Sequence, residues 1–179
     1  VLDDLAEYKV VRGDKSSTAE TDAMVALKNA ISEKIGVELK PSTDYNSATK
    51  EILVGKTKRD VSVAALEGLK DNDYVIKPVG NKIVIIGGSD EATTAAVNYF
   101  IENYIDTESK TVKVPQGDGF AYIPEYKMKS FVIGGVSLGE YKIKFDSVTE
   151  EIANKFCDDI LNVYLGEKLE SVNAIVDNG

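Results

Sequence analysis

The stretch Glu51-Ile52-Leu53-Val54-Gly55 and the later stretch YVIKPVGNKIVIIGG, residues 74–88, decide the fold of this chain. The first is a compact apolar run, which predicts a central strand. In the second, Tyr74–Val79 and Lys82–Ile86 flank Gly80-Asn81, and a two-residue turn of this kind predicts a β-hairpin. Pro78 cannot donate a ladder hydrogen bond, so we expect it at an edge or an outward-facing position.

Two amphipathic helices are predicted, one before these strands in the sequence and one after them. The first has Thr18 as its N-cap, runs for about 18 residues and ends at Gly36, which suits a left-handed C-terminal cap. Its apolar positions recur at helical spacing: Met24, Leu27, Ile31 and Ile35. The second follows the cap residue Ser89. Its expected buried face consists of Ala96, Val97, Phe100, Ile101, Tyr104 and Ile105.

Shorter patterns complete the predicted domain. Strands are expected at Glu7–Val11 and Val37–Leu39, the latter stopping at Pro41. A short helix is expected between Arg59 and Leu69, with Val63, Leu66 and Leu69 inward. A second hairpin is expected from Thr111–Val114 and Phe120–Ile123. Residues 1–130 are therefore predicted to form an α+β two-layer sandwich, in which a mixed β-sheet carries two main helices on one face. The residues expected to be buried together are Leu27, Ile31, Val97, Phe100 and Ile101.

The last third of the chain restarts the same pattern. LAEYKV at residues 5–10 matches LGEYKI at residues 138–143, and IGVEL at 35–39 matches LGEKL at 165–169. We expect residues 131–179 to form a partial second copy, a β–α–β unit; the alternative is chance recurrence. Because repeats usually come as whole units, a copy that stops there suggests a chain cut from a longer protein. The expected helix, from about Val148 to Leu165, should still bury Phe156, Ile160 and Leu161.

Composition excludes several classes of function. The chain has 21 Lys and Arg against 30 Asp and Glu, a net charge of −9. Such an acidic surface repels phosphate backbones, which argues against nucleic acid as a partner. The chain has no histidine and a single cysteine, Cys157. Ser–His and Cys–His catalytic pairs, His-based metal sites and an internal disulfide are thereby ruled out.

The candidate site residues favour structural roles. Gly87-Gly88-Ser89 could cradle an anion at a helix start, but it lacks the spacing of a phosphate loop and fits a helix cap. Asp71 and Asp73 could bind Ca²⁺, but the rest of an EF-hand loop is missing and a turn fits better. The adjacent Asp158 and Asp159 point about 100° apart on a helix, and Cys157 fits burial as a small hydrophobe. Sugar-stacking surfaces could come from Tyr45, Tyr74, Tyr99, Tyr104, Tyr122 and Tyr126, but most tyrosines in such patterns instead straddle the core boundary.

The order of these motifs resembles a known accessory domain. Glu51–Gly55, then Tyr74–Ile76, then Lys82–Gly88 leading into AAVNYF, residues 95–100, is similar to the N-terminal, non-catalytic α+β domain of bacterial β-hexosaminidases and α-glucuronidases. The resemblance covers roughly residues 5–125. The chain departs from that family at Val97 and Asn98, where a small glycine is common. The resemblance implies a carbohydrate-related parent protein and carries over no catalytic residue.

The expected function is a non-catalytic accessory or interaction module of a larger secreted or surface bacterial protein linked to carbohydrate processing. Its partners would be neighbouring domains of that protein. The alternative is a cell-surface module that binds a glycan or a protein. An enzyme ranks last, because no nucleophile–base pair or carboxylate pair is evident. We expect no catalytic residue, no cofactor and no metal, and an extracellular or cell-surface location.

Overall fold

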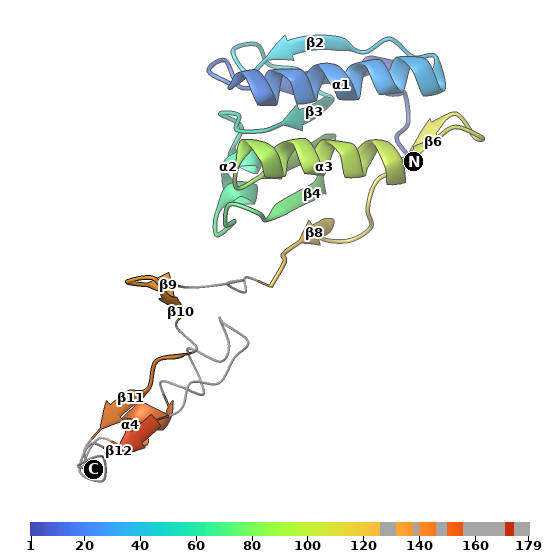
Figure 1. The fold of residues 1–179 in the computed structure, drawn as a ribbon. Coiled ribbons are helices and arrows are strands. Elements are labelled where there is room, and N and C mark those ends of the chain that lie inside the picture. Colours follow the sequence, from blue (N-terminus) through green and yellow to red (C-terminus); the bar gives the residue numbers. More distant parts are fainter. Residues whose placement is uncertain (126–131, 138–139, 146–149, 156–170, 174–179) are drawn as a thin grey trace. The chain divides into compact units, whose positions relative to one another are not determined.

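The computed structural model describes residues 1–125, 132–137, 140–145, 150–155 and 171–173 (Figure 1). The chain divides into two compact units, Val1–Pro124 and Glu125–Gly179. The helical elements of the first unit are the 3₁₀-helix η1 (Leu5–Glu7), α1 (Thr18–Ile35), α2 (Asp60–Leu66) and α3 (Asp90–Asn103). Its strands are β1 (Lys9–Arg12), β2 (Lys40–Thr43), β3 (Glu51–Val54), β4 (Tyr74–Val79), β5 (Lys82–Gly87), β6 (Ile105–Asp106), β7 (Thr111–Val112) and β8 (Phe120–Tyr122).

The first unit is built on one six-stranded mixed sheet with the order β2-β1-β3-β5-β4-β8. Strands β2, β1, β3 and β5 are parallel to their neighbours in that series. Strand β4 runs antiparallel to both β5 and β8. All four residues of β3 are buried, as expected for a central strand with partners on both sides. The predicted α+β class with a mixed sheet is confirmed.

Helices α1 and α3 lie side by side on one face of the sheet (Figure 1). The strand residues facing them form the main core with both helices, and alternate strand residues face the short helix α2 on the other side. Of the five residues expected to be buried together, Leu27, Ile31, Val97 and Phe100 are fully buried and Ile101 is partly buried against them. The second core consists of Val11, Leu53, Ala65, Val75, Val84 and Ile86, with Val61, Leu66 and Leu69 against it.

The prediction that Val63 points inward is wrong. Its side chain is 60% exposed, whereas Val61 and Ala65, four residues apart, face the sheet. Residues two apart on a helix point about 200° away from each other, so Val63 lies opposite to that pair. The inward placement of Leu66 and Leu69 holds, since both pack against the second core.

The ends of α1 and the first hairpin follow the sequence closely. The N-cap of α1 is Ser17, one residue before the expected Thr18, and its side chain accepts a hydrogen bond from the Glu20 backbone N–H. Gly36 ends the helix with φ of 84°, as expected. Pro78 pairs only with β5, because β8 pairs with β4 no further than Ile76.

Two predicted strands are displaced. The strand expected at Val37–Leu39 is β2, three residues later, and it contains Pro41. Proline is tolerated there because β2 is the edge strand and pairs with β1 alone. The second predicted hairpin is wrong: β7 pairs with β6, and β8 pairs with β4 of the main sheet. The ring of Phe120 explains part of this, since it stacks on Tyr99 of α3 with centroids 4.3 Å apart.

The second unit contains β9 (Val132–Ile133), β10 (Val136–Ser137), β11 (Ile143–Phe145), α4 (Glu150–Lys155) and β12 (Ser171–Asn173). Strands β11 and β12 are parallel, with Ile143 opposite Ser171. In the first unit Val10 lies opposite Pro41, and these positions correspond to Ile143 and Ser171 when the sequence matches are extended by two residues. The two strand pairs therefore have the same register. Phe156, Ile160, Leu161 and most of the expected helix lie outside the described residues, so the repeat stays a prediction.

Candidate functional site

The sheet changes its winding direction between β1 and β3. The chain leaves β1, passes through α1 and returns in β2 on one side. It leaves β3, passes through α2 on the opposite face and returns in β4 on the other side. Because these two parallel strands are neighbours, their carboxyl ends diverge into separate loops. In open α/β sheets, ligands bind in the crevice at such a point.

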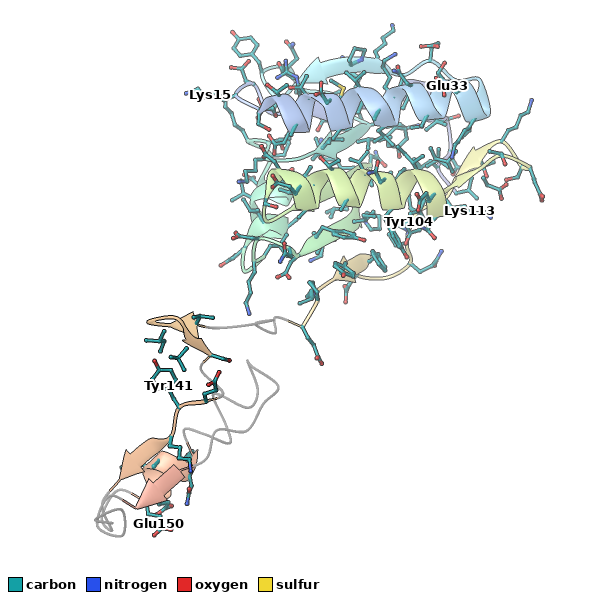
Figure 2. The ribbon with its side chains drawn as sticks, in the orientation of Figure 1. Lys15, Glu33, Tyr104, Lys113, Tyr141 and Glu150 are labelled. Atoms are coloured by element: carbon teal, nitrogen blue, oxygen red, sulfur yellow. The ribbon has the colours of Figure 1, made fainter. Side chains whose placement is uncertain are left out.

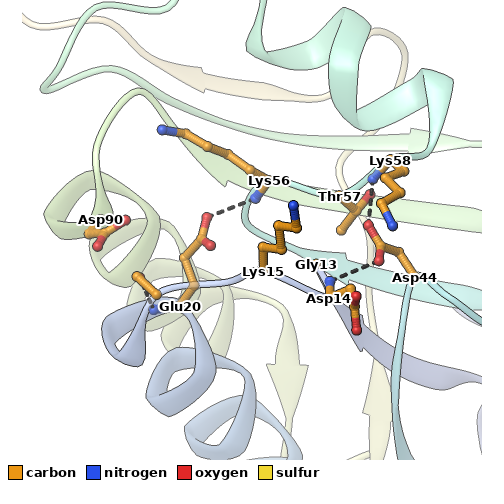
Figure 3. A pocket seen from close by; sticks show the side chains of 10 residues that line it. Gly13, Asp14, Lys15, Glu20, Asp44, Lys56, Thr57, Lys58 and Asp90 are labelled. Atoms are coloured by element: carbon orange, nitrogen blue, oxygen red, sulfur yellow. Dashed lines mark hydrogen bonds between the residues drawn. The ribbon is translucent and has the colours of Figure 1, made fainter.

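An open cavity of about 450 Å³ lies at this position (Figure 3). It is lined by the loop after β1, the turn after β2, the loop after β3 and the starts of α1 and α3. The lining residues are Gly13, Asp14, Lys15, Ser17, Glu20, Asp44, Lys56, Thr57, Lys58 and Asp90. We call this the switch-point cavity. Both signs of charge are represented in it.

Glu20 ties α1 to the loop after β3. Its side chain is 3% exposed, and its Oε1 accepts a hydrogen bond of 2.8 Å from the backbone N–H of Lys56 (Figure 3). Gly55 precedes that amide with φ of 71°, a left-handed conformation that favours glycine. A Cβ at Gly55 would lie 2.3 Å from Glu20 Oε1. The glycine therefore serves both the turn and the close approach of the carboxylate.

Asp44 joins the loops on either side of it. Its side chain is 5% exposed. Oδ1 accepts from the Asp14 backbone N–H at 2.8 Å, and Oδ2 accepts from the Lys58 backbone N–H at 2.7 Å (Figure 3). Both oxygens of this carboxylate are thus engaged by main-chain donors. Asp44 fixes the shape of the cavity wall.

The turn that carries Asp44 is held in place by Arg59, which also forms an ion pair with Glu51. Arg59 donates from Nη1 to the Asp44 carbonyl at 3.1 Å and from Nη2 to the Asn46 carbonyl at 2.6 Å. Its guanidinium also contacts both carboxylate oxygens of Glu51, which is fully buried. Tyr45, between the two accepted carbonyls, is 80% exposed. The backbone on both sides of Tyr45 is therefore fixed by hydrogen bonds, while its ring is exposed to solvent.

Glu51 stays ionised inside the protein. Burial would raise the pKa of this carboxyl, but hydrogen bonds and charge from Arg59 and Lys82 outweigh that effect and lower the pKa below its ordinary value of 4.5. The Lys82 ammonium pairs with Glu51 Oε2, and the Ala48 backbone N–H donates to Oε1. The charge is fully compensated, which makes this a structural pair.

Three lysines line the cavity, and their side chains point in different directions. Figure 3 shows that the Lys15 side chain points into the cavity and that the Lys58 side chain lies near Asp44. The Lys56 side chain extends away from the other two lysines. All three side chains are exposed. Within the described part of the chain, none of the three forms an ion pair, whereas Lys50, Lys82 and Lys113 do. The lining thus combines three lysines with four carboxylates, of which only Glu20 and Asp44 accept main-chain hydrogen bonds in the described ranges.

The glycine pair before α3 serves close packing. Ser89 is the N-cap of α3, as expected, and its Oγ accepts from the Ala92 backbone N–H at 3.1 Å. A Cβ at Gly87 would lie 2.4 Å from the backbone of Ala92, and one at Gly88 would lie 2.0 Å from the Lys70 carbonyl. The chain therefore needs glycine at both positions for the helix to approach the sheet.

The acidic candidates divide into those that the structure places and those it does not. Asp73 is 2% exposed, and its Oδ2 accepts from the Lys70 backbone N–H at 2.8 Å, which caps the turn before β4. Asp71 is exposed at the start of that turn. The described ranges contain no cluster of three acidic or sulfur side chains that would hold a metal. Cys157, Asp158 and Asp159 lie outside the described residues.

Four of the six candidate tyrosines belong to one aromatic cluster, of which Figure 2 labels Tyr104. Tyr74 is buried and stacks on Tyr122 at 5.0 Å between ring centroids, while Tyr99 and Tyr104 contact each other at 6.2 Å. These rings straddle the core boundary. Tyr45 is the exception, since nothing in the described structure stacks on it. Tyr126 lies outside the described residues.

Comparisons with known proteins add little. No family model matches the chain, and no curated protein matches it. Among solved structures, a similar one is a GH138 enzyme targeting pectin rhamnogalacturonan II, with 14% identity and a TM-score of 0.45 over 86% of this chain. The chain spans 16% of the length of that enzyme. A likeness of this strength establishes neither a shared fold nor a shared function.

Proposed function

We propose that this chain is a non-catalytic accessory module of a larger secreted or cell-surface bacterial protein linked to carbohydrate processing. The observation that carries the proposal is the state of the two buried carboxylates in the switch-point cavity. Asp44 accepts main-chain N–H bonds at both oxygens, and Glu20 accepts one while packed against Gly55. Both side chains hold loops together.

Catalysis at this cavity would need a group free to exchange a proton with a substrate. A general acid or base must reach the reacting proton within about 3 Å. Glu20 and Asp44 are committed to the backbone, and the chain has no histidine to act in their place. The two remaining carboxylates of the cavity are Asp14 and Asp90. Asp14 is exposed, and Asp90 lies in the first turn of α3, where the helix dipole stabilises a negative charge. The geometry therefore favours binding or packing over turnover.

The accessory role, the surface location and the carbohydrate link are parts of the same proposal. Their support is the resemblance of residues 5–125 to the non-catalytic domain of β-hexosaminidases and α-glucuronidases. The partners would be neighbouring domains of the parent protein. Among the residues that the structure places, no helix is long and apolar enough to span a membrane. The alternative, a surface module that binds a glycan or a protein, is favoured by the exposure of Tyr45.

Turnover measurements on the full chain test the proposal. The chain should release no chromophore from a panel of aryl glycosides, including aryl glucuronides and aryl N-acetylglucosaminides. The informative variants are Asp14→Asn and Asp90→Asn, because they neutralise cavity carboxylates without removing a loop tether. Turnover by the wild type that disappears in either variant, with the circular dichroism spectrum unchanged, would overturn the non-catalytic assignment.

A further inference from the structure

We propose that Asp118–Gly119, in the turn before β8, is a modification site at which the aspartate isomerises to isoaspartate through a cyclic succinimide. The site lies outside the switch-point cavity and does not depend on the proposed function. Asp118 is exposed, and its carboxylate forms no hydrogen bond or ion pair with any residue that the structure describes. This carboxyl group can therefore turn toward the backbone that follows it.

The chemistry needs only these two neighbouring residues and water. The backbone nitrogen of Gly119 attacks Cγ of the protonated Asp118 carboxyl group. The new N–Cγ bond closes the succinimide ring, and the carboxyl hydroxyl group leaves as water together with the amide proton. Water then opens the ring at either carbonyl carbon. Opening at the main-chain carbonyl leaves Gly119 attached through Cγ, which is isoaspartate, whereas opening at Cγ restores aspartate.

The backbone around Asp118 favours ring closure. Gly117 and Gly119 on either side are left-handed, with φ of 61° and 100°, and glycine adopts such conformations without steric cost. Gly119 has no side chain to shield its nitrogen. Its N–H donates to the Gln116 carbonyl at 3.3 Å, which is longer than the usual range of about 2.7–3.2 Å. The attacking nitrogen is therefore only weakly held.

The sequence supplies internal standards for the rate. No other aspartate of the chain is followed by glycine. Asp14 and Asp71 are also exposed, but a lysine follows the first and an asparagine the second. The side chains of these following residues hinder attack by their own backbone nitrogens. Exposure being shared, the three positions differ in the residue that provides the nitrogen.

Isoaspartate at position 118 would displace the start of β8. Gly119 lies close to β4, since a Cβ there would be 2.4 Å from the Ile76 carbonyl oxygen. Isoaspartate directs the main chain through Cβ and Cγ, which lengthens it by one methylene group and leaves the former main-chain carboxyl group as a branch. Only the short β8 pairing holds this segment on β4. We therefore expect Phe120 to separate from Tyr99, on which its ring stacks.

The test is ageing of the purified full chain for several weeks at neutral pH and physiological temperature, followed by peptide mapping. Electron-transfer fragmentation distinguishes isoaspartate from aspartate in each peptide. We expect isoaspartate at position 118 to accumulate at least about tenfold faster than at Asp14 or Asp71, a ratio that corresponds to about 1.4 kcal/mol of activation free energy. Equal rates at the three positions, or no isoaspartate at position 118, would overturn the site.

Asp118→Glu is the matched control, because it keeps the charge while a glutamate has to close a larger and less favourable ring. The near-ultraviolet circular dichroism of this chain comes mainly from tyrosine and phenylalanine, since it has no tryptophan. That signal should weaken in the aged wild type and stay unchanged in aged Asp118→Glu. An unchanged wild-type signal after isoaspartate has formed, or equal weakening in both proteins, would overturn the effect on β8.

Discussion

Glu51 and Arg59 form two hydrogen bonds with each other, Nε to Oε2 at 3.0 Å and Nη2 to Oε1 at 2.7 Å. The glutamate opens the central strand β3, while the arginine lies just before α2. The same guanidinium holds the turn around Tyr45. One ion pair therefore connects the middle of the sheet with the wall of the switch-point cavity.

Glu51→Ala should strongly destabilise the first unit. Removing this carboxylate leaves Arg59 and Lys82 without their shared counter-charge, and breaking a buried ion pair costs about 3–5 kcal/mol. Urea denaturation followed by circular dichroism gives the free energy of unfolding. Glu33→Ala on the exposed side of α1 is the control, expected within about 0.5 kcal/mol of the wild type. A similar small change for Glu51→Ala would mean that the pair contributes little.

Acid should unfold the chain partly through Glu51. Its pKa is lowered in the folded state, so its contribution to stability is present above the ordinary value of 4.5 and is lost as the pH falls through the folded value. The free energy of unfolding should decline below about pH 4.5. In Glu51→Gln, which cannot titrate, that decline should be shallower. Parallel pH profiles for the two proteins would contradict the role assigned to this carboxylate.

Gly55→Ala should cost more stability than Gly36→Ala. Both glycines are left-handed, with φ of 71° and 84°, and an alanine in that conformation costs about 1–2 kcal/mol. Only Gly55 has a neighbour in the way, Glu20 Oε1. Displacing that carboxylate should add about 1–3 kcal/mol, because a buried hydrogen bond is lost. Equal losses of stability for the two variants in thermal unfolding would show that the close contact between Gly55 and Glu20 does not limit the residue at position 55.

Phe100→Ala should destabilise the main core by about 3–5 kcal/mol, since its ring is fully buried under α3. Asn98→Ala, exposed on the same helix, is the control and should change the free energy of unfolding by less than about 0.5 kcal/mol. Chemical denaturation of both variants checks the difference. A loss below about 1 kcal/mol for Phe100→Ala would place the ring outside the core.

The regular elements with strong local signals were predictable from the sequence. The residues of α1, the hairpin around Gly80 and the buried strand β3 are set by apolar spacing and turn chemistry. The pairing of β8 was not predictable, because Phe120 and Tyr122 pair with a strand that lies far earlier in the chain, at Tyr74–Ile76. A local pattern predicts that a segment is a strand, but long-range packing decides its neighbour.

The candidate site was missed for a related reason. Glu20, Asp44 and Arg59 lie on three different connections, and none of them belongs to a recognisable motif. Only the sheet order brings the ends of β1, β2 and β3 to one edge. The usable signal was the pair of loops that follow the apolar strands, with Gly13 after β1 and Gly55 after β3. The more conspicuous local motifs, Asp71 with Asp73 and the glycine pair before α3, are not among the residues that line the cavity.

The repeat prediction has a direct structural test. The shared pairing register of β1–β2 and β11–β12 leads us to expect that the two β–α–β segments superpose along their whole length. An experimental structure of the full chain would check this by superposing the backbone of residues 142–173 on that of residues 9–43. A helix after β11 that crosses the strands in a different direction would contradict a common origin.

The central claim is that the carboxylates of the switch-point cavity hold loops together and carry out no catalysis. The most direct measurement is chromophore release from the panel of aryl glycosides by the full chain, compared with its Asp14→Asn and Asp90→Asn variants. The account predicts that none of the three proteins releases chromophore faster than the buffer alone. Release by the wild type that is lost in either variant, with the circular dichroism spectrum unchanged, would contradict it.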